Sequence, residues 1–172
     1  MRRRLWTLAL PMVLALALPG CKPVEPQQVD NANLGIKATF PGPATLHRHI
    51  EDTPFGSIEW FDTSYYSSGR LDENFHVEVG NLPPGKQGGD TPAAVLPTFH
   101  KYLDRRIGPI ERTDLAKEQG PGFRYRTKGP QGTEMGGIVV VRRGRIHHAQ
   151  ATVPKATDPR LRSFLDSFEV AK

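Results

Sequence analysis

The sequence predicts an α+β fold, in which a mostly antiparallel β-sheet of roughly six to eight strands is packed by helices. Two kinds of pattern support this fold class. Several short segments alternate apolar and polar residues, which is typical of strands with one buried face. Two longer segments repeat apolar residues at helical spacing and open on a capping residue followed by proline. The 172 residues suffice for one domain, and the 17 glycines and 16 prolines predict many turns.

Four strands are expected before the first helix. In the last of them Phe75, Val77 and Val79 alternate with polar residues, so we expect one face of this strand to be buried and the other to face solvent. Each strand ends at a glycine, a proline or a polar turn. The four segments are 36–40, 46–50, 56–65 and 74–79.

Thr91 and Pro92 predict the start of a helix, with threonine as the capping residue and proline in the first turn. Apolar residues at helical spacing continue to Ile107, and Gly108 ends the helix. Pro97 conflicts with this assignment, because a proline inside a helix costs about 3 kcal/mol. The helix is therefore expected either to kink at Pro97 or to begin there.

A second β region and a closing helix follow. The segments expected to be extended are a short one at Leu115 and those at 123–127, 137–141 and 145–153. Residues 142–144 predict a hairpin turn, and the pair Gly136-Gly137 predicts a bulge or a close approach to the backbone. Asp158-Pro159 begins the last helix, and we expect Phe164 and Phe168 to pack against the sheet. The apolar stripe of this helix is Leu161, Phe164, Leu165 and Phe168.

Residues 1–20 have the features of a bacterial lipoprotein signal peptide. Three arginines precede the 14-residue apolar stretch Leu5–Leu18, which is too short to span a bilayer comfortably. Residues 18–21, Leu-Pro-Gly-Cys, then resemble the lipobox, although alanine or serine is more usual than Pro19. Cys21 is the only cysteine of the chain, so it cannot form an internal disulfide and is the expected lipidation site.

An ordinary cleaved signal peptide and an uncleaved N-terminal anchor are the alternatives. Lys22 after the cysteine favours the outer membrane under enteric-type sorting, so we expect the protein on the periplasmic face of that membrane in the cell envelope. The lipidated cysteine and a flexible tether are assigned to residues 21–34, which carry proline, glutamine and asparagine without periodicity. The globular domain is assigned to residues 35–172.

The net charge of the chain is +5, and it falls to +2 without the three arginines of the signal peptide. That charge is too small to predict nucleic-acid binding. Residues 22–100 carry a net charge of −5, and residues 101–172 one of +7. We expect strands from the two halves to pair in one sheet and neutralise each other. A basic face for an anionic partner is the alternative.

Five short segments carry a family resemblance. They are 36–41 (IKATFP), 120–125 (GPGFRY), 145–151 (RIHHAQA), 153–155 (VPK) and 163–168 (SFLDSF). These motifs are similar to those of small bacterial proteins with a PsbP-like fold, including DcrB-like lipoproteins, and they span roughly residues 36–170. The resemblance implies an antiparallel sheet sandwiched by helices and a role in binding or assembly. It implies no catalytic residues.

The sequence has no serine nucleophile elbow and no phosphate-binding loop, so we expect no enzyme, cofactor or metal site. The alternative is a small envelope enzyme or metal-binding protein that uses four histidines. His47 and His49 share one face of a predicted strand, whereas His147 and His148 point to opposite faces. Three imidazoles would approach a metal only if the two strands were neighbours. Otherwise we expect these histidines to face solvent.

Two segments are candidates for partner binding. Tyr65 and Tyr66 are consecutive, so one ring should face the core and the other should face outward. The outward ring, with Arg70 beside it, would anchor a protein partner. The alternative is that this segment is only a strand end followed by a turn, with both tyrosine rings covering the edge of the sheet.

The second segment is the tip of the predicted hairpin, where Arg142, Arg143 and Arg145 lie close together. They would contact anionic lipid, lipopolysaccharide or an acidic partner, or they would form a solvated turn that resists edge pairing. The expected function is therefore that of a lipid-anchored cell-envelope protein. It would act as a non-catalytic binding or assembly module for another envelope protein.

Overall fold

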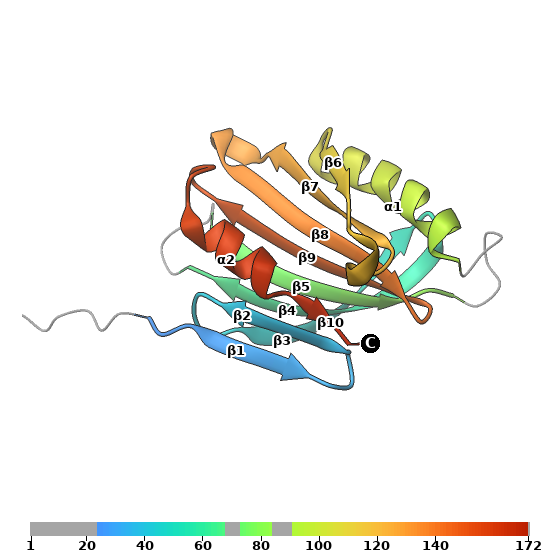
Figure 1. Ribbon diagram of the computed structural model, residues 1–172, viewed down its shortest axis with the longest axis horizontal. Helices are drawn as coiled ribbons and strands as arrows, with labels where there is room; N and C mark the ends of the chain where they lie inside the picture. The colour runs from blue at the N-terminus through green and yellow to red at the C-terminus, as the bar shows by residue number, and fades with distance from the viewer. Residues whose placement is uncertain (1–23, 68–72, 84–90, 172) are drawn as a thin grey trace, which may run out of the picture.

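A computed structural model describes residues 24–67, 73–83 and 91–171 of the chain (Figure 1). Within these residues the chain forms ten β-strands and two α-helices, and the strands make two antiparallel sheets. The predicted α+β class, with an antiparallel sheet packed by helices, is therefore confirmed. None of the helices in these ranges is long and apolar enough to cross a membrane.

The larger sheet has seven strands in the order β3-β4-β5-β9-β8-β7-β6, and all neighbouring strands are antiparallel. The pairing of β5 with β9 is the exception to sequential order, because α1 and three strands separate these two in the chain. The strands are β3 (Thr45–Thr53), β4 (Gly56–Tyr66), β5 (Asn74–Asn81), β6 (Glu111–Asp114), β7 (Gly122–Lys128), β8 (Glu134–Arg142) and β9 (Arg145–Val153).

The smaller sheet contains β1 (Gln27–Asn31), β2 (Ile36–Phe40) and β10 (Glu169–Val170), in the order β1-β2-β10. The predicted tether is wrong for β1, because these residues pair with β2 along their whole length. Leu34 is buried as well, so the folded domain begins before residue 35. An edge strand held through its backbone keeps mostly exposed side chains, and it therefore shows no apolar alternation in the sequence. Cys21 lies outside the described residues.

Two α-helices pack on the larger sheet. Helix α1 (Pro92–Ile107) begins at the predicted residue and continues through the exposed Pro97. Asp158 caps α2 (Pro159–Ser167) as predicted, since its side chain accepts a hydrogen bond from the Arg160 backbone N–H at 3.0 Å. The described chain also has two short 3-10 helices, η1 (Lys117–Gln119) and η2 (Pro130–Gly132).

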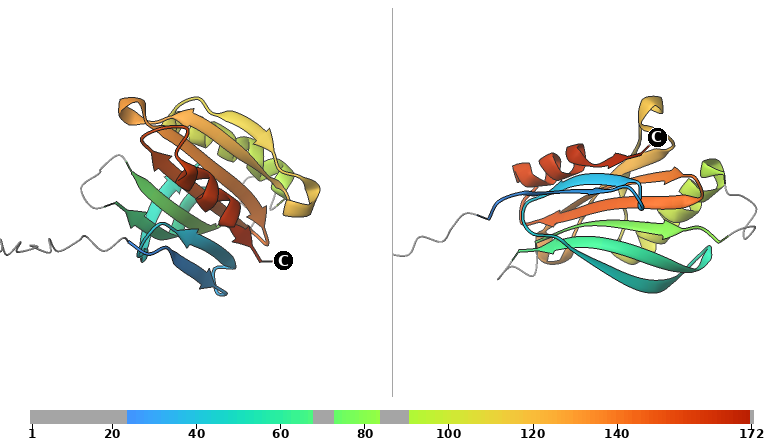
Figure 2. Two further views of the ribbon diagram at one scale, coloured as in Figure 1. Left: turned by 60° about the vertical axis from the view of Figure 1, so that its left-hand side comes forward. Right: turned by 90° about the horizontal axis from the view of Figure 1, so that it is seen from below.

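The two faces of the larger sheet are covered differently (Figures 1 and 2). Helix α2 and the smaller sheet cover one face, where Phe40, Phe75 and Phe164 lie in a common core. Helix α1 covers part of the other face, where Trp60 packs with Phe99. Successive residues of a strand point to opposite faces. In β5, Phe75, Val77 and Val79 therefore lie on the α2 face, and His76 and Glu78 lie on the α1 face.

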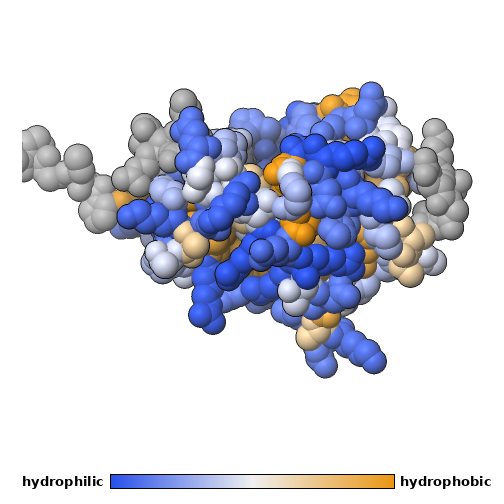
Figure 3. Space-filling model, turned by 90° about the horizontal axis from the view of Figure 1, so that it is seen from above, coloured by the Kyte–Doolittle hydropathy of each residue, from blue (hydrophilic) through white to orange (hydrophobic). Residues whose placement is uncertain are grey.

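Arg143 and Gly144 form the turn between β8 and β9, with φ values of 52° and 70°. Two consecutive positive φ angles are typical of a two-residue hairpin turn, so the predicted hairpin is confirmed. The face of the molecule in Figure 3 is largely hydrophilic, with small hydrophobic patches. In the described part of the chain, the large hydrophobic side chains that remain exposed are Val24, Leu46, Ile50 and Tyr66.

The predicted burial of Phe164 and Phe168 is confirmed. Phe164→Ala should lower the free energy of unfolding by about 3–5 kcal/mol, the usual range for truncating a buried phenylalanine. Its side chain is 1% exposed, and its ring centroid lies 5.2 Å from that of Phe40 and 5.4 Å from that of Phe75. Urea denaturation of the variant measures the change.

The control for this experiment is Arg162→Ala in the same helix, because the Arg162 side chain is 87% exposed. The control should change the free energy of unfolding by less than about 0.5 kcal/mol. An equally small change for Phe164→Ala would contradict the packing of α2 in the core.

Candidate functional site

A row of polar side chains crosses the α1 face of the larger sheet. The strand register pairs His47 with Asp62, Asp62 with Glu78, and Glu78 with His148, on four neighbouring strands. Directly opposite residues share a face, so we call these four residues the polar row. The Phe99 ring of α1 lies 5.8 Å from the His148 ring. The polar row therefore borders the apolar core beneath α1.

His148 is the buried centre of the polar row. Its Nδ1 lies 3.1 Å from Glu78 Oε2, and its Nε2 lies 2.7 Å from Tyr125 Oη. The Tyr125 hydroxyl donates in turn to Gln150 Oε1 at 2.8 Å. Burial would raise the pKa of Glu78, but the hydrogen bond from His148 and the positive groups nearby lower that pKa to about 2. Glu78 is therefore held as a carboxylate inside the protein.

Tyr125 reaches His148 because Gly137, the residue opposite it on β8, has no side chain. A Cβ atom at Gly137 would overlap with the Tyr125 ring. The close approach that the Gly136-Gly137 pair predicts is thus confirmed at Gly137. The group that approaches is an aromatic ring on the neighbouring strand.

His76 and Asp62 lie on the same face, nearer to solvent. His76 Nδ1 lies 3.8 Å from both Asp62 Oδ1 and Glu78 Oε1. Burial is the main reason why the pKa of His76 is lowered and that of Asp62 is raised. Arg106 of α1 reaches the same region, with Nη1 3.9 Å from Glu78 Oε2 and 3.5 Å from Glu51 Oε2. Carboxylates therefore outnumber guanidinium groups here.

The prediction that the histidines face solvent is wrong for His147 and His148, which are both buried because both faces of β9 are covered. His147 faces the α2 side, and burial and two neighbouring arginines lower its pKa to about 4. His47 and His49 lie on β3, which β4 and β5 separate from β9. The three-imidazole arrangement therefore does not form.

Sequence reasoning missed Asp62, His76, Glu78 and Tyr125 as members of one cluster. The alternation in residues 74–79 predicts a polar side that faces solvent, whereas Glu78 is buried and His76 is largely covered. The sequence signal that could have found the cluster is the pair His76 and Glu78, two titratable residues on the polar side of the predicted strand 74–79.

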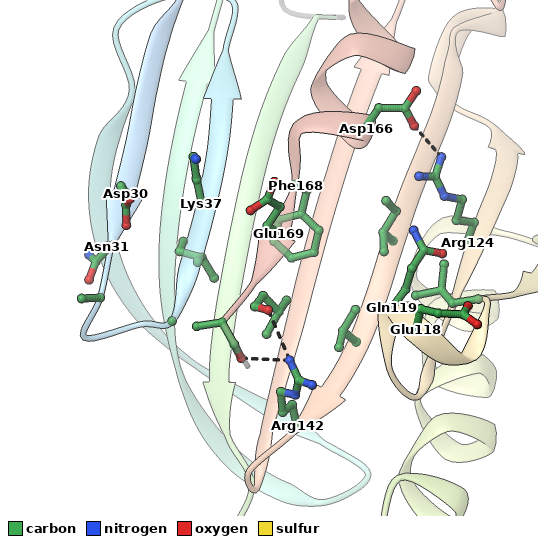
Figure 4. A pocket seen from close by; sticks show the side chains of 18 residues that line it. Asp30, Asn31, Lys37, Glu118, Gln119, Arg124, Arg142, Asp166, Phe168 and Glu169 are labelled. Carbon is green, nitrogen blue, oxygen red and sulfur yellow. Dashed lines mark hydrogen bonds and ion pairs between the residues drawn. The ribbon is translucent and has the colours of Figure 1, made fainter.

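A groove of about 600 Å³ opens on the α2 face of the larger sheet (Figure 4). Ile138 and Val140 of β8 form its apolar floor together with Phe168. Polar side chains of β1 and β2 form one rim, and Glu118 and Gln119 of η1 form the opposite rim. The groove therefore combines an apolar floor with charges of both signs at its edges.

Two arginines fix the shape of the groove. Arg142 Nη1 donates to the backbone carbonyls of Val170 at 3.3 Å and Ala171 at 3.0 Å, which ties the C-terminal strand to β8. Arg124 Nη1 donates to Asp166 Oδ1 at 2.9 Å, which ties α2 to β7. Figure 4 shows these contacts at opposite ends of the groove.

The two predicted tyrosines point in opposite directions, as expected. Tyr65 is partly buried, with its ring centroid 6.2 Å from that of Phe75, whereas Tyr66 is 63% exposed. Tyr66 lies on the α1 face beside a cavity of about 260 Å³ that His76 also lines. Arg70 lies outside the described residues.

The three hairpin arginines have different surroundings. Arg142 lines the groove, and Arg143 is exposed at the turn. Arg145 donates to Asn81 Oδ1 at 3.0 Å and to the Asn33 carbonyl at 2.9 Å. Arg142 and Arg145 are therefore engaged in contacts that hold the fold together.

Comparisons with known proteins find a likeness among solved structures but none among family models or curated proteins. No protein-family model matches the sequence, and no curated protein is found to be similar to it. Among solved structures, the chain is similar to cyanobacterial PsbP (CyanoP) from Synechocystis sp. PCC 6803, with 14% identity and a TM-score of 0.49. The match covers 90% of this chain and 97% of that one. At this similarity the likeness says nothing about ligands.

Glu78→Gln should flatten the loss of stability in acid. The pKa of Glu78 is about 2 in the folded protein against an ordinary 4.5. The ionised group therefore stabilises the fold fully above pH 4.5, and this contribution disappears as the pH falls towards 2. The lost contribution is about 3 kcal/mol at most. Urea denaturation at a series of pH values measures it.

The matched control is Glu59→Gln, because the Glu59 side chain is 47% exposed and pairs only loosely with Arg48, at 3.6 Å. Its profile should follow that of the wild type. If Glu78→Gln also follows the wild-type profile between pH 4.5 and 2, the Glu78–His148 contact does not contribute to stability.

Proposed function

We propose that the protein is a lipid-anchored protein of the bacterial cell envelope that acts as a non-catalytic binding or assembly module. The groove on the α2 face is its partner-binding surface. The observation that carries this proposal is a groove of about 600 Å³ in which charged rims border an apolar floor, which suits a docked polypeptide segment.

The charges around the groove favour a protein partner over a purely anionic ligand. The groove is lined by four carboxylates (Asp30, Glu118, Asp166 and Glu169) and three basic side chains (Lys37, Arg124 and Arg142). Such a mixed and nearly balanced set of charges does not select an anionic lipid head group. A polypeptide supplies apolar side chains for the floor and both signs of charge for the rims. An envelope protein is therefore the expected occupant.

The position of the groove is compatible with an N-terminal anchor at Cys21. Gln27, near the start of the described chain, pairs with Phe40, whereas Asn31 pairs with Ile36 at the other end of the smaller sheet. Asn31 and Ile36 line the groove. The groove thus lies at the end of the small sheet away from the point where the chain enters the fold. An anchored protein on the periplasmic face of the outer membrane would leave it accessible.

Replacing the anchor residue tests the first part of the proposal. Cys21→Ser removes the thiol that would carry acyl chains, each of which contributes about 0.8 kcal/mol per buried CH₂ group. The variant should remain as an unprocessed precursor or be released from membranes on cell fractionation. A processed variant that still fractionates with membranes would contradict lipid anchoring.

Site-specific photo-crosslinking in cells tests whether the groove is the partner-binding surface. A photoreactive residue at Gln119 on the rim should give a discrete adduct, whereas one at the exposed Lys101 on α1 should not. Glu118→Lys should weaken the Gln119 adduct without lowering the melting temperature, because Glu118 is exposed. Equal adducts from both positions, or none from Gln119, would contradict the groove as the partner surface.

A further inference from the structure

We propose that Asp62, His76 and Glu78 form a binding site for one divalent transition-metal ion, with Zn²⁺ as the reference ion. The site lies on the α1 face of the larger sheet. The groove lies on the α2 face, so metal binding and partner binding use separate surfaces.

The register of β4 and β5 brings the three ligands together. Asp62 and Glu78 are directly opposite each other, and His76 precedes Glu78 by two residues on the same face. One ligand atom from each residue lies within 4.8 Å of the others. Zinc binds imidazole nitrogen and carboxylate oxygen at about 2.0–2.2 Å. An ion placed between His76 Nδ1 and either carboxylate oxygen, 3.8 Å away, therefore reaches both atoms.

The ligand atoms are free of competing contacts in the described part of the chain. His148 occupies Glu78 Oε2, which leaves Oε1 directed towards His76. This arrangement, in which a second group orients a ligand, is typical of metal sites. Asp62 Oδ1 is buried and has no hydrogen-bond partner among the described residues. A buried carboxylate oxygen without a partner is costly, and a bound cation would satisfy it.

A second buried group next to the site also lacks a partner. Ser64 is opposite His76 on β4 and is 1% exposed, and its hydroxyl oxygen makes no hydrogen bond among the described residues. A metal-bound water would lie within reach of such a group. A bound ion with its water would supply a partner for both buried oxygens.

The charge balance also favours a cation. Glu51, Asp62 and Glu78 face this region, and Arg106 of α1 is the guanidinium that contacts two of them. The remaining titratable side chains that face the site from β3, β9 and α1 are His47, His49, His148 and Tyr102. A divalent ion would balance the excess negative charge.

The site is enclosed but can be reached from solvent. The side chains of Asp62 and His76 are 14% and 16% exposed. His76 also lines the cavity of about 260 Å³ beside Tyr66, which offers an entry path. These values favour an ion held between strands with one side open to water.

Metal titration of the full-length protein in detergent tests the proposal. Zn²⁺ in competition with a chromophoric chelator should reveal one equivalent bound. Asp62→Asn and His76→Gln should each weaken Zn²⁺ binding by about 100-fold or more. Replacing a residue that only orients a metal ligand already lowers metal affinity by about 10–100-fold. His100→Gln is the control, because His100 has one carboxylate neighbour, Asp104 at 3.6 Å, and should not affect this site.

Two further measurements keep the outcome decisive. Asp62→Asn should fold normally, because asparagine has nearly the same size and shape and Asp62 Oδ1 makes no hydrogen bond among the described residues, and its melting temperature in metal-free buffer checks this. In the wild-type protein, NMR should show that Zn²⁺ shifts the ring resonances of His76 more than those of His100. The proposal is overturned if no saturable binding occurs. It is also overturned if binding is unaffected by both variants and leaves the His76 resonances in place.

Discussion

The antiparallel pairing of β5 with β9 is the contact on which the rest of the structure depends. It joins the β3–β5 half of the larger sheet to the β6–β9 half, from Asn74 opposite Thr152 to Asn81 opposite Arg145. Without it, each half would leave an unpaired edge in what is now the middle of the core. The pairing also brings together the negative and positive halves of the sequence. Glu78 and His148 meet across it in the buried interior.

This pairing determines the chemistry of both faces. On the α2 face, the phenylalanine and valines of β5 pack in one core with Ala149, Ala151 and Val153 of β9 and with α2 and β2, which leaves the groove over neighbouring β8. On the α1 face, the same register aligns the polar row at the border of the α1 core. Cross-strand alignment thus creates a cluster of titratable groups on one face and a docking surface on the other. The two proposed activities would be independent of each other because the sheet separates them.

The parts of the fold that were predictable from the sequence are those that neighbouring residues specify. The alternation around Val77, the turn at Gly144 and the cap at Asp158 are each encoded within a few residues. Strand β1 was not predictable, because an edge strand paired through its backbone needs no apolar pattern. The cluster of Asp62 and Glu78 was not predictable either, since it depends on the register between β4 and β5, which the pattern within each strand does not specify. The groove likewise requires the C-terminal strand to return to β2.

Native-state amide hydrogen exchange tests the central role of the β5–β9 pairing most directly. If this pairing unites the sheet, the most protected amides of β5 and β9 should exchange with the same free energy of opening. That value should equal the free energy of global unfolding measured with urea, because the two halves would open only together. Exchange of β3–β5 through an opening of clearly lower free energy, while β7–β9 stay protected, would contradict the account.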